Sequence, residues 1–230
     1  MGRPLPPDGE GLVDHAINRG DNREVVFIDD QDHPAFLSSL GRTQLRYPFR
    51  VYGYCLMSNR FHLLLRPEPT TTIGRILQSL TVAHTRRYHR RHRTSGHGWQ
   101  GRFKSPVVQS DGHLWAVLEY IEANPLRARM VANPAAYRWS SYPAHGEGRP
   151  DPLLDPPPER ADLGPDETAR RITWRRKVRD DQPADEVESI RRSLRGGLPF
   201  GKAAWFEEIA GKLGKKLERR SPGRPRKAEI

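Results

Sequence analysis

Two strand-like segments joined by a very short connection place the strongest constraint on how this chain folds. Residues 49–57 and 60–66 both read as strands whose side chains alternate between two faces. Only Ser58 and Asn59 lie between them, so the pair predicts an antiparallel hairpin with a tight turn. In the first strand, the alternation predicts one shared face made of Phe49, Val51, Gly53, Cys55 and Met57.

The segments around this hairpin complete the order β-α-β-β-α-β-α. They are a strand over 12–18, a helix capped by Asp29 or Asp30, a helix capped by Thr71 or Thr72, a strand over 103–109, and a helix capped by Asp111 that ends at Asn124-Pro125. This order predicts the α+β class, with a ferredoxin-like split βαββαβ antiparallel sheet and helices on one face. The opposite face is left free for His62 and for the last helix, which carries Tyr120.

The composition divides the chain into three parts. Residues 1–145 hold the strand and helix pattern, and we expect them to form the main domain. Residues 146–182 are predicted to be a mostly irregular linker, because the first half is rich in Gly, Pro and acidic residues. Residues 183–230 predict a helical, basic C-terminal extension, with helices over 185–194 and 202–217 before a tail too basic to fold alone.

Three polar side chains are predicted to meet on the open face of the sheet. His62 faces away from Phe61 and Leu63, because side chains alternate along a strand. Tyr120 and Asn124 are four residues apart on the last predicted helix, so they share one stripe of it. A histidine, an amide oxygen and a tyrosine hydroxyl brought together can hold a divalent metal beside a nucleophile that attacks phosphate. Taken singly, each of these residues also suits a structural role.

The positive charge of the chain favours a nucleic-acid partner. The 230 residues carry a net charge of +11, and an excess of that sign attracts polyanions. Residues 84–104 mix cations with aromatic side chains and contain no carboxylate, which suits binding to phosphates and unpaired bases. The candidate nucleic-acid-binding residues in this run are Arg86, Arg87, Arg90, Arg91, Arg93, Arg102 and Lys104. A solvated helix face, or a ribosome-associated protein, is the alternative interpretation.

The tail and the cysteine content bear on partners and compartment. Arg224 and Arg226 lie in a Gly-Arg-Pro-Arg-Lys segment that resembles hooks inserted into a narrow A·T minor groove, although a nonspecific basic tail is the alternative. The single cysteine, Cys55, excludes an internal disulfide and argues against a cysteine-built zinc site. No apolar run approaches the length of a membrane span, and no secretory signal opens the chain. We therefore expect a cytoplasmic, nucleoid-associated protein with no membrane partner.

Four motifs taken together resemble those of one family. They are Met57-Ser-Asn-Arg-Phe-His-Leu-Leu-Leu, Trp99-Gln-Gly-Arg-Phe-Lys, Tyr120-Ile-Glu-Ala-Asn-Pro-Leu-Arg-Ala and Tyr137-Arg-Trp-Ser-Ser-Tyr. Their order is similar to that in the REP-associated tyrosine transposases, which belong to the single-tyrosine HUH superfamily. The resemblance covers about residues 12–145 and extends to Leu198-Pro-Phe-Gly and the basic tail.

The resemblance implies an HUH-type nuclease domain in residues 1–145 that binds hairpin-forming single-stranded DNA as a monomer or homodimer. It implies a transposase that works as a metal-dependent DNA endonuclease and strand transferase. In that reaction Tyr120 would attack a phosphodiester, giving a 5′-phosphotyrosine link and a free 3′-OH. His62 and Asn124 would be ligands of Mg²⁺ or Mn²⁺. The family's metal-binding pair is His-hydrophobic-His, and Arg60 occupies the place of the first histidine.

The arginine at position 60 opens further interpretations. Arginine stays protonated and offers no lone pair to a metal. A fixed cation at ~4 Å also repels a divalent ion by several kcal/mol at an effective dielectric of about 20. One interpretation is an active transposase in which Arg60 clamps a phosphate. The alternatives are a catalytically impaired, domesticated DNA-binding protein and a basic RNA-binding protein. The presence of both Tyr120 and Asn124 favours the active transposase.

Overall fold

The computed structural model describes residues 11–158 and 160–213, which are built around a four-stranded antiparallel sheet. The strands are β1 (Val13–Arg19), β2 (Phe49–Met57), β3 (Arg60–Pro67) and β4 (Val107–Val108), in the spatial order β2-β3-β1-β4. The predicted hairpin is present, with Met57 paired to Arg60 beside the turn. The order of elements and strands confirms the predicted α+β class and the split βαββαβ pattern.

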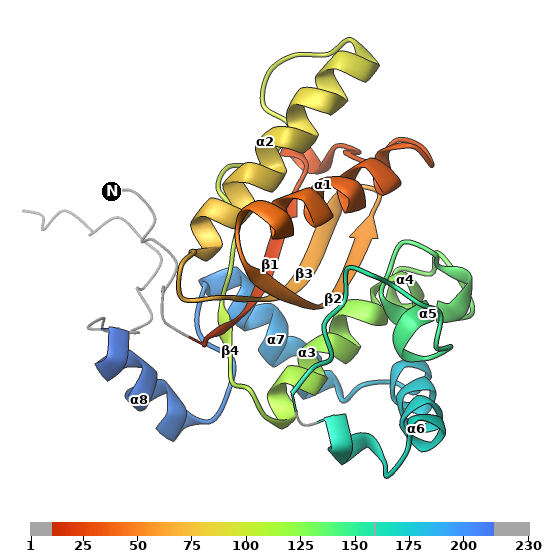
Figure 1. Ribbon diagram of the computed structural model, residues 1–230, viewed down its shortest axis with the longest axis vertical. Helices are drawn as coiled ribbons and strands as arrows, with labels where there is room; N and C mark the ends of the chain where they lie inside the picture. Colours follow the sequence, from red (N-terminus) through yellow and green to blue (C-terminus); the bar gives the residue numbers. More distant parts are fainter. Residues whose placement is uncertain (1–10, 159, 214–230) are drawn as a thin grey trace, which may run out of the picture.

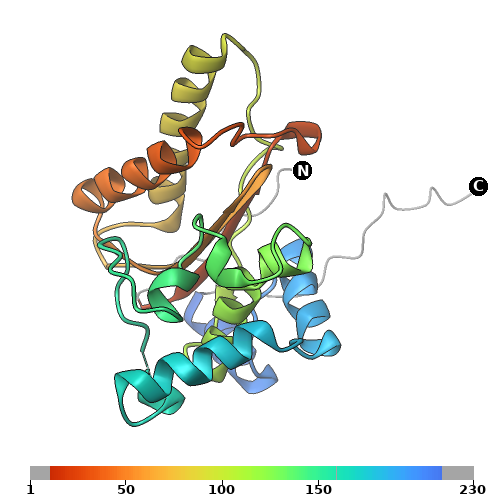
Figure 2. The same ribbon diagram turned by 90° about the vertical axis from the view of Figure 1, so that its right-hand side faces the viewer.

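Helices cover both faces of the sheet (Figure 1). α1 (Asp32–Arg46) and α2 (Ile73–His92) pack on one face, and α3 (Gly112–Glu122) packs on the other. α6 (Glu167–Arg179) and α7 (Ala184–Gly196) contact α3. Figure 2 shows the two helical layers separated by the sheet. The remaining elements are α4 (Asn124–Arg127), α5 (Tyr142–His145), α8 (Ala203–Leu213) and the 3₁₀ turns η1 (Asp21–Arg23), η2 (Pro134–Ala136) and η3 (Arg160–Leu163).

The sheet separates two hydrophobic cores. Phe61, Leu63 and Leu65 of β3 are buried against α1 and α2, as their alternation predicts. Leu64 of the same strand is buried in the other core, beneath α3 and the C-terminal helices. Because the side chains of a strand alternate, His62 lies on the α3 side together with Leu64. The predicted division of β3 into two faces is therefore confirmed.

The predicted face of β2 is wrong because the strand contains a β-bulge. The register of β2 against β3 shifts between Val51 and Gly53. Phe49 and Val51 consequently face α1 and α2, whereas Cys55 and Met57 face α3. An extra residue in one strand reverses the facing of every side chain beyond it, which simple alternation along the sequence does not anticipate.

Two of the three predicted helix starts are confirmed. Thr72 caps α2, where its hydroxyl accepts a hydrogen bond from the N–H three residues on at 3.3 Å. Asp111 caps α3 in a similar way, with a distance of 2.9 Å to the N–H two residues on. α1 begins at Asp32 instead of directly after Asp29 or Asp30. The carboxylate of Asp29 instead binds the N–H two residues on, at 2.8 Å, within the turn that precedes the helix.

β4 is shorter than the strand predicted over 103–109. Lys104 exchanges two backbone hydrogen bonds with β1, of 2.8 and 2.9 Å, but Pro106 has no N–H to continue the ladder. Pairing resumes at β4. On the outer side of β4, Phe200 forms a parallel bridge, and its N–H donates to the carbonyl oxygen of Val107 at 2.8 Å. The C-terminal extension therefore covers this edge of the sheet.

The irregular linker predicted over 146–182 is wrong in its second half, which forms α6. Asp166 caps this helix and accepts a hydrogen bond from the N–H three residues on at 2.8 Å. Trp174 of α6 is 1% exposed and lies edge-to-face on Trp115 of α3, with ring centroids 5.4 Å apart. Only Trp174 and Val178 of α6 are buried, so the apolar stripe of the helix is too narrow to stand out in the sequence.

The other predictions for the C-terminal extension fall partly outside the described residues. The helix predicted over 185–194 is confirmed as α7. The helix predicted over 202–217 is present as α8 as far as residue 213. Arg224 and Arg226 of the basic tail lie outside the described residues. In the part of the chain that the structure describes, no helix is long and apolar enough to cross a membrane.

A buried carboxylate fastens α3 to α5 and α6. Glu122, the last residue of α3, has 0% exposure and accepts a hydrogen bond from Trp174 Nε1 at 2.7 Å. Its other oxygen lies 2.6 Å from His145 Nδ1 and accepts a hydrogen bond from Ser141 Oγ. Buried polar groups of this kind stabilise a fold only when every member has a partner. Glu122 therefore connects the helix of Tyr120 to the segments that follow it.

Replacing Glu122 with alanine is expected to lower the free energy of unfolding by about 3 kcal/mol or more, because buried donors lose their acceptor. Chemical denaturation followed by tryptophan fluorescence measures this change. Glu147→Ala is the matched control, since it breaks only a surface ion pair with Arg175 at 3.7 Å and should cost less than about 1 kcal/mol. Equal losses in the two variants would show that Glu122 does not fasten these helices.

Candidate active site around Tyr120

Tyr120 lies in the last turn of α3, against the sheet face that carries His62. The two rings meet edge-to-face, with centroids 5.9 Å apart. The Tyr120 side chain is largely buried and lines a cavity together with Arg60 and His62. The structure thus brings together the tyrosine and the histidine that the sequence placed on facing elements.

A second histidine, His15 of β1, supports this arrangement. Its Nε2 lies 3.0 Å from His62 Nδ1, and its ring centroid is 5.9 Å from that of Tyr120. Burial lowers the pKa of His15 to about 3. Burial, followed by electrostatic repulsion from His15, Arg60 and Arg127 when His62 is protonated, lowers the pKa of His62 well below its ordinary value. Both imidazoles are therefore neutral near pH 7.

A bound metal requires a lone pair that no other group uses. His62 Nε2 is buried and has no hydrogen-bond partner among the described residues. A neutral imidazole carries one N–H and one lone pair. When His62 Nδ1 donates to His15, Nε2 keeps the lone pair and the ring is held in one orientation, as a metal ligand requires.

Asn124 offers a second ligand atom of the right kind. Its amide nitrogen donates to the carbonyl oxygens of Tyr120, at 3.0 Å, and Ile121, at 3.3 Å. The amide oxygen remains as an acceptor, and Asn124 lines the same cavity as His62. An imidazole nitrogen and an amide oxygen fit Mg²⁺ or Mn²⁺, which complete their coordination with water and phosphate oxygens. No cluster of three or more His, Cys, Asp or Glu side chains able to hold a metal occurs among the described residues.

Arg127 of α4 adds a cation directly over the tyrosine. Its guanidinium carbon lies 4.5 Å from the centroid of the Tyr120 ring, and its Nη2 donates to the carbonyl oxygen of Tyr120. A guanidinium over an aromatic face is attracted to the ring, so this contact fixes the orientation of the Tyr120 side chain. Burial lowers the pKa of Arg127, but arginine remains charged at pH 7.

The cavity around Tyr120 is strongly cationic. It has a volume of about 560 Å³ and is lined from β1, β3, the segment before β4, α3, α4 and α7. Seven of its fifteen lining residues are arginine or lysine and none is aspartate or glutamate, so the cavity suits an anion. The cationic lining residues are Arg19, Arg60, Arg102, Lys104, Arg127, Arg191 and Arg195.

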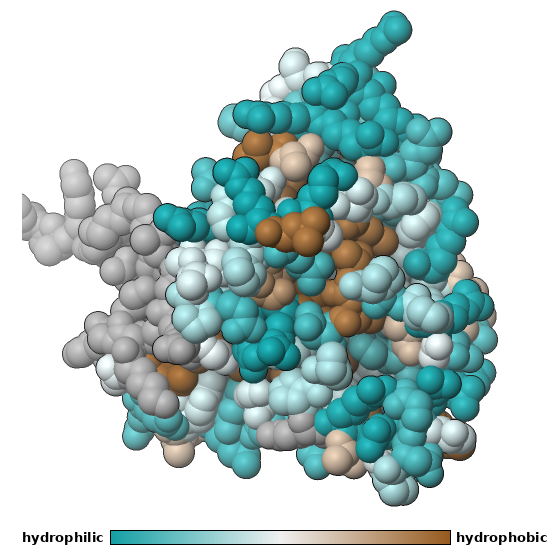
Figure 3. Space-filling view, viewed as in Figure 1, coloured by the Kyte–Doolittle hydropathy of each residue, from teal (hydrophilic) through white to brown (hydrophobic). Residues whose placement is uncertain are grey.

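The structure divides the predicted nucleic-acid-binding residues between two sides of the molecule. Arg102 and Lys104 line the Tyr120 cavity. Arg86 instead lines a groove of about 630 Å³ between α1 and α2, on the opposite face of the sheet, and Arg87 lines a neighbouring hollow. Arg90 and Arg93 lie at the C-terminal end of α2. Figure 3 shows hydrophilic side chains covering this projecting end of the molecule.

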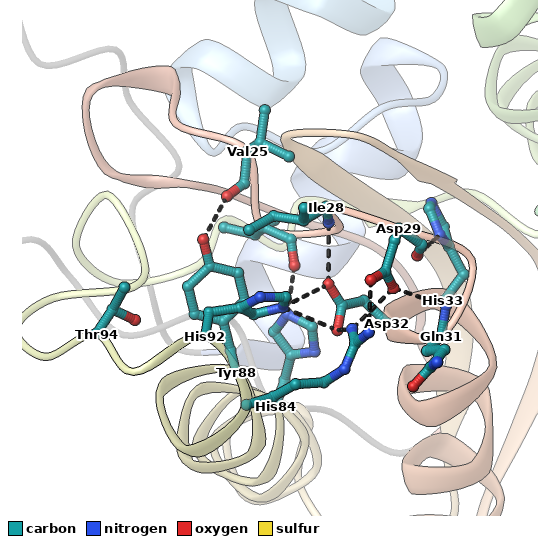
Figure 4. Close-up of polar contacts among 12 residues, drawn as sticks. Val25, Ile28, Asp29, Gln31, Asp32, His33, His84, Tyr88, His92 and Thr94 are labelled. Atoms are coloured by element: carbon teal, nitrogen blue, oxygen red, sulfur yellow. Dashed lines mark hydrogen bonds and ion pairs between the residues drawn. The ribbon is translucent and has the colours of Figure 1, made fainter.

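Arg91 differs from the other arginines of α2 because it forms ion pairs within the protein. Its guanidinium contacts Asp29 at 2.5 Å and Asp32 at 2.8 Å. Asp32 is 2% exposed and also contacts His92 at 3.0 Å and accepts from the N–H of Ile28 at 2.9 Å (Figure 4). These contacts join the start of α1 to the end of α2. The charge of Arg91 is therefore already paired within the protein.

The sequence analysis missed several residues that line the cavity, and it missed His15, which lies behind the cavity and contacts His62. His15 occupies the same face of β1 as Ile17, which pairs with His62 across the sheet, so the strand register is the signal that locates it. Arg127 lies beyond the helix end predicted at Asn124-Pro125, and nothing in the sequence places it over the tyrosine. The remaining missed residues are Arg19 of β1 and Arg191 and Arg195 of α7. Only the folded structure shows that β1 and α7 meet at the cavity.

The antiparallel sheet and the helix that carries Tyr120 match the fold of a transposase. A sequence model of the family described as "Transposase IS200 like" matches residues 10–124, which include His62, Tyr120 and Asn124. The chain belongs to the IS200-like transposase family.

A solved structure supports the same fold. One similar structure is a REP-associated tyrosine transposase bound to a REP hairpin, with 14% sequence identity, a TM-score of 0.53, and coverage of 67% of this chain and 88% of that chain. A transposase from Deinococcus radiodurans R1, described as putative, gives 18% identity and a TM-score of 0.38 over 56% of this chain and 91% of that chain. No curated protein sequence gives a significant match. The family match shows an IS200-like transposase, and the resemblance to the REP-associated transposases is confirmed in fold.

Proposed function

We propose that this transposase recognises hairpin-forming single-stranded DNA, by sequence or by structure, and cleaves and rejoins it through a covalent bond between Tyr120 and a 5′ phosphate. The observation that carries the proposal is the position of Tyr120 beside His62, in a cavity that is lined by cationic side chains and by no carboxylate. Among the similar structures is one bound to a REP hairpin, which supports a hairpin substrate for this chain as well.

In the proposed reaction, the Tyr120 oxygen attacks the phosphorus atom and the bond to the 3′ oxygen breaks. The strand is then joined to the protein through its 5′ phosphate, and the 3′-OH leaves. Arg127 holds the tyrosine ring in place, while Arg60 and Arg127 offset the negative charge of the phosphate. Attack by the freed 3′-OH of another strand on the phosphotyrosine reverses the same steps and rejoins the DNA.

His62 and Asn124 are the residues proposed to hold Mg²⁺ or Mn²⁺, with His15 orienting His62. A divalent ion held by these residues would polarise the phosphate and would lower the energy of the charged transition state. Arg60 and Arg127 line the same cavity, and their charges oppose the binding of a cation. We therefore propose that the metal is weakly held.

The position of Arg60 also favours a second candidate function, a DNA-binding protein that has lost cleavage. Arg60 lines the cavity together with His62, so a phosphate can bind there without a metal. This candidate keeps the hairpin partner and removes the covalent step. An RNA-binding protein is separated from both by competition, because hairpin DNA should displace a labelled hairpin DNA better than duplex RNA does.

Salt dependence provides a test of the DNA-binding surface. We expect Arg102→Ala with Lys104→Ala to weaken binding of a linear single strand and to lower the slope of log affinity against log salt by about 0.7 for each lost contact. Arg86→Ala with Arg90→Ala should leave the affinity for this linear strand unchanged and should weaken only the binding of a hairpin. The reason is that α2 lies across the sheet from the cavity. Fluorescence anisotropy at several salt concentrations measures both effects.

The two double variants remove the same charge and therefore control for each other. An unchanged slope for the α2 variant on a hairpin would mean that Arg86 and Arg90 form only a solvated helix face. An unchanged slope for the cavity variant on both DNAs would contradict the proposed passage of the strand past Tyr120.

A further inference from the structure

Helix α7 forms one wall of the Tyr120 cavity. Arg191, Leu194 and Arg195 line the cavity and are three and four residues apart, so they share one stripe of the helix. α7 follows the family match by many residues, since that match covers residues 10–124. The nuclease domain predicted from the sequence therefore lacks a part of its own cavity, which the C-terminal extension supplies.

The position of α7 is fixed by packing and by hydrogen bonds. Val187, Ile190 and Leu194 are buried in the core that contains α3. Lys104 Nζ donates to the carbonyl oxygen of Arg195 at 3.4 Å, which ties the end of α7 to the segment before β4. The helix ends at Gly196 and is capped by Gly197, whose φ of 66° is a left-handed conformation suited to glycine. The stripe facing the cavity is thus held on a rigid element.

The charges on this stripe face other cations across the cavity. Arg191 is exposed, and no ion pair between it and a carboxylate occurs among the described residues. Arg195 pairs with Glu188 of its own helix at the surface. After burial, the charge of Arg191 is among the causes that lower the pKa of Arg127, so the two guanidinium groups repel each other. An anion between them would relieve this repulsion.

We propose that Arg191, assisted by Arg195, binds a backbone phosphate of the single strand next to the phosphate that Tyr120 attacks. This inference rests on the proposed function. A cavity of about 560 Å³ falls in the size range of ligand pockets and has room for more than one phosphate group. Arg60 and Arg127 contact the attacked phosphate beside Tyr120, and Arg191 and Arg195 of α7 contact the adjacent phosphate of the strand. The contact is to the backbone, so it positions the strand and does not read its bases.

Two adjacent arginines on α7 provide a matched pair of variants. Arg191 and Arg192 are both exposed on the same helix, but only Arg191 lines the cavity. Arg191→Ala and Arg192→Ala thus change the net charge equally. We expect Arg191→Ala to weaken binding of a hairpin with a single-stranded flank by roughly five- to tenfold and to lower the salt slope by about 0.7. Arg192→Ala should change neither value appreciably, and thermal unfolding checks that both variants are folded.

A neutral phosphate analogue locates the contact. The probe is a set of synthetic DNA hairpins, each with one methylphosphonate in its single-stranded flank. At one position in the flank, the methylphosphonate should weaken binding to the wild-type protein and to Arg192→Ala. It should not weaken binding to Arg191→Ala, because that variant already lacks the arginine that pairs with the phosphate. Binding is measured in a Tyr120→Phe background so that cleavage does not interfere.

The outcomes separate this inference from the function on which it rests. Equal losses for Arg191→Ala and Arg192→Ala, or a methylphosphonate effect that Arg191→Ala leaves intact at every position, would overturn the α7 contact while DNA binding itself stands. If the wild-type protein binds hairpin and unrelated DNA or RNA equally, the proposed function fails, whatever the α7 variants do.

Discussion

Replacing Tyr120 with phenylalanine is expected to abolish the covalent protein–DNA adduct, reducing it by at least about a thousandfold, to the background of the assay. The substitution removes the oxygen that attacks phosphorus but keeps the ring beneath Arg127 and beside His62. The fold and the DNA affinity should therefore stay close to those of the wild type. A labelled hairpin with single-stranded flanks, incubated with Mg²⁺ or Mn²⁺ and run on a denaturing gel, reports the adduct directly.

Tyr137→Phe is the matched control for this experiment. Tyr137 is also buried, and its hydroxyl donates to the carbonyl oxygen of Leu56 at 2.6 Å, away from the residues that line the cavity. We expect this variant to lose some stability but to form the adduct. An adduct that persists in Tyr120→Phe would assign the nucleophile to another residue, and peptide mapping of the labelled protein would identify it.

Replacing Arg60 with histidine is expected to raise metal-dependent nicking of a hairpin-bearing strand by about tenfold or more. The substitution removes a fixed cation from the cavity and adds an imidazole on the same face of β3 as His62. Coordination and electrostatics then change in the same direction. Mn²⁺ binding, followed as a concentration-dependent rise in thermal stability without DNA, gives a second measurement that does not depend on activity.

Arg60→Gln separates the two causes, because it removes the charge without adding an imidazole. It should strengthen Mn²⁺ binding less than Arg60→His does. If the wild type cleaves well and Arg60→His cleaves less, Arg60 is a phosphate clamp and the argument for an impaired metal site is wrong. If both proteins bind hairpins and neither cleaves them, the DNA-binding candidate replaces the enzyme.

The parts of the fold that follow local rules were predictable from the sequence. The hairpin of β2 and β3 and the caps at Thr72 and Asp111 depend on neighbouring residues, so spacing alone reveals them. The bulge in β2 was not predictable in this way, because it depends on pairing with β3 and on packing under α3. α6 was missed for a related reason, since Trp174 is buried by a partner that is distant in the sequence.

The residues of the candidate site likewise differ in whether a local sequence pattern reveals them. His62, Tyr120 and Asn124 were found because each stands at a recognisable spacing within one strand or one helix. His15 was missed because its role depends on the pairing of β1 with β3. Arg91 was assigned to DNA from the charge of its own helix, whereas its partners Asp29 and Asp32 lie at the start of another. Contacts between distant segments thus decide which cations remain available to a ligand.

The parallel bridge between Phe200 and β4 has a consequence for how the protein is made. β1, β2 and β3 emerge from the ribosome and can pair well before Phe200 is synthesised. Joining Phe200 to β4 closes a long loop. This folding step is slow, because the chain loses conformational entropy before the contact forms. α7 immediately precedes this junction. We therefore expect nascent chains that stop short of Phe200 to lack a finished cavity, so that the proposed DNA cleavage is withheld until synthesis has passed that residue.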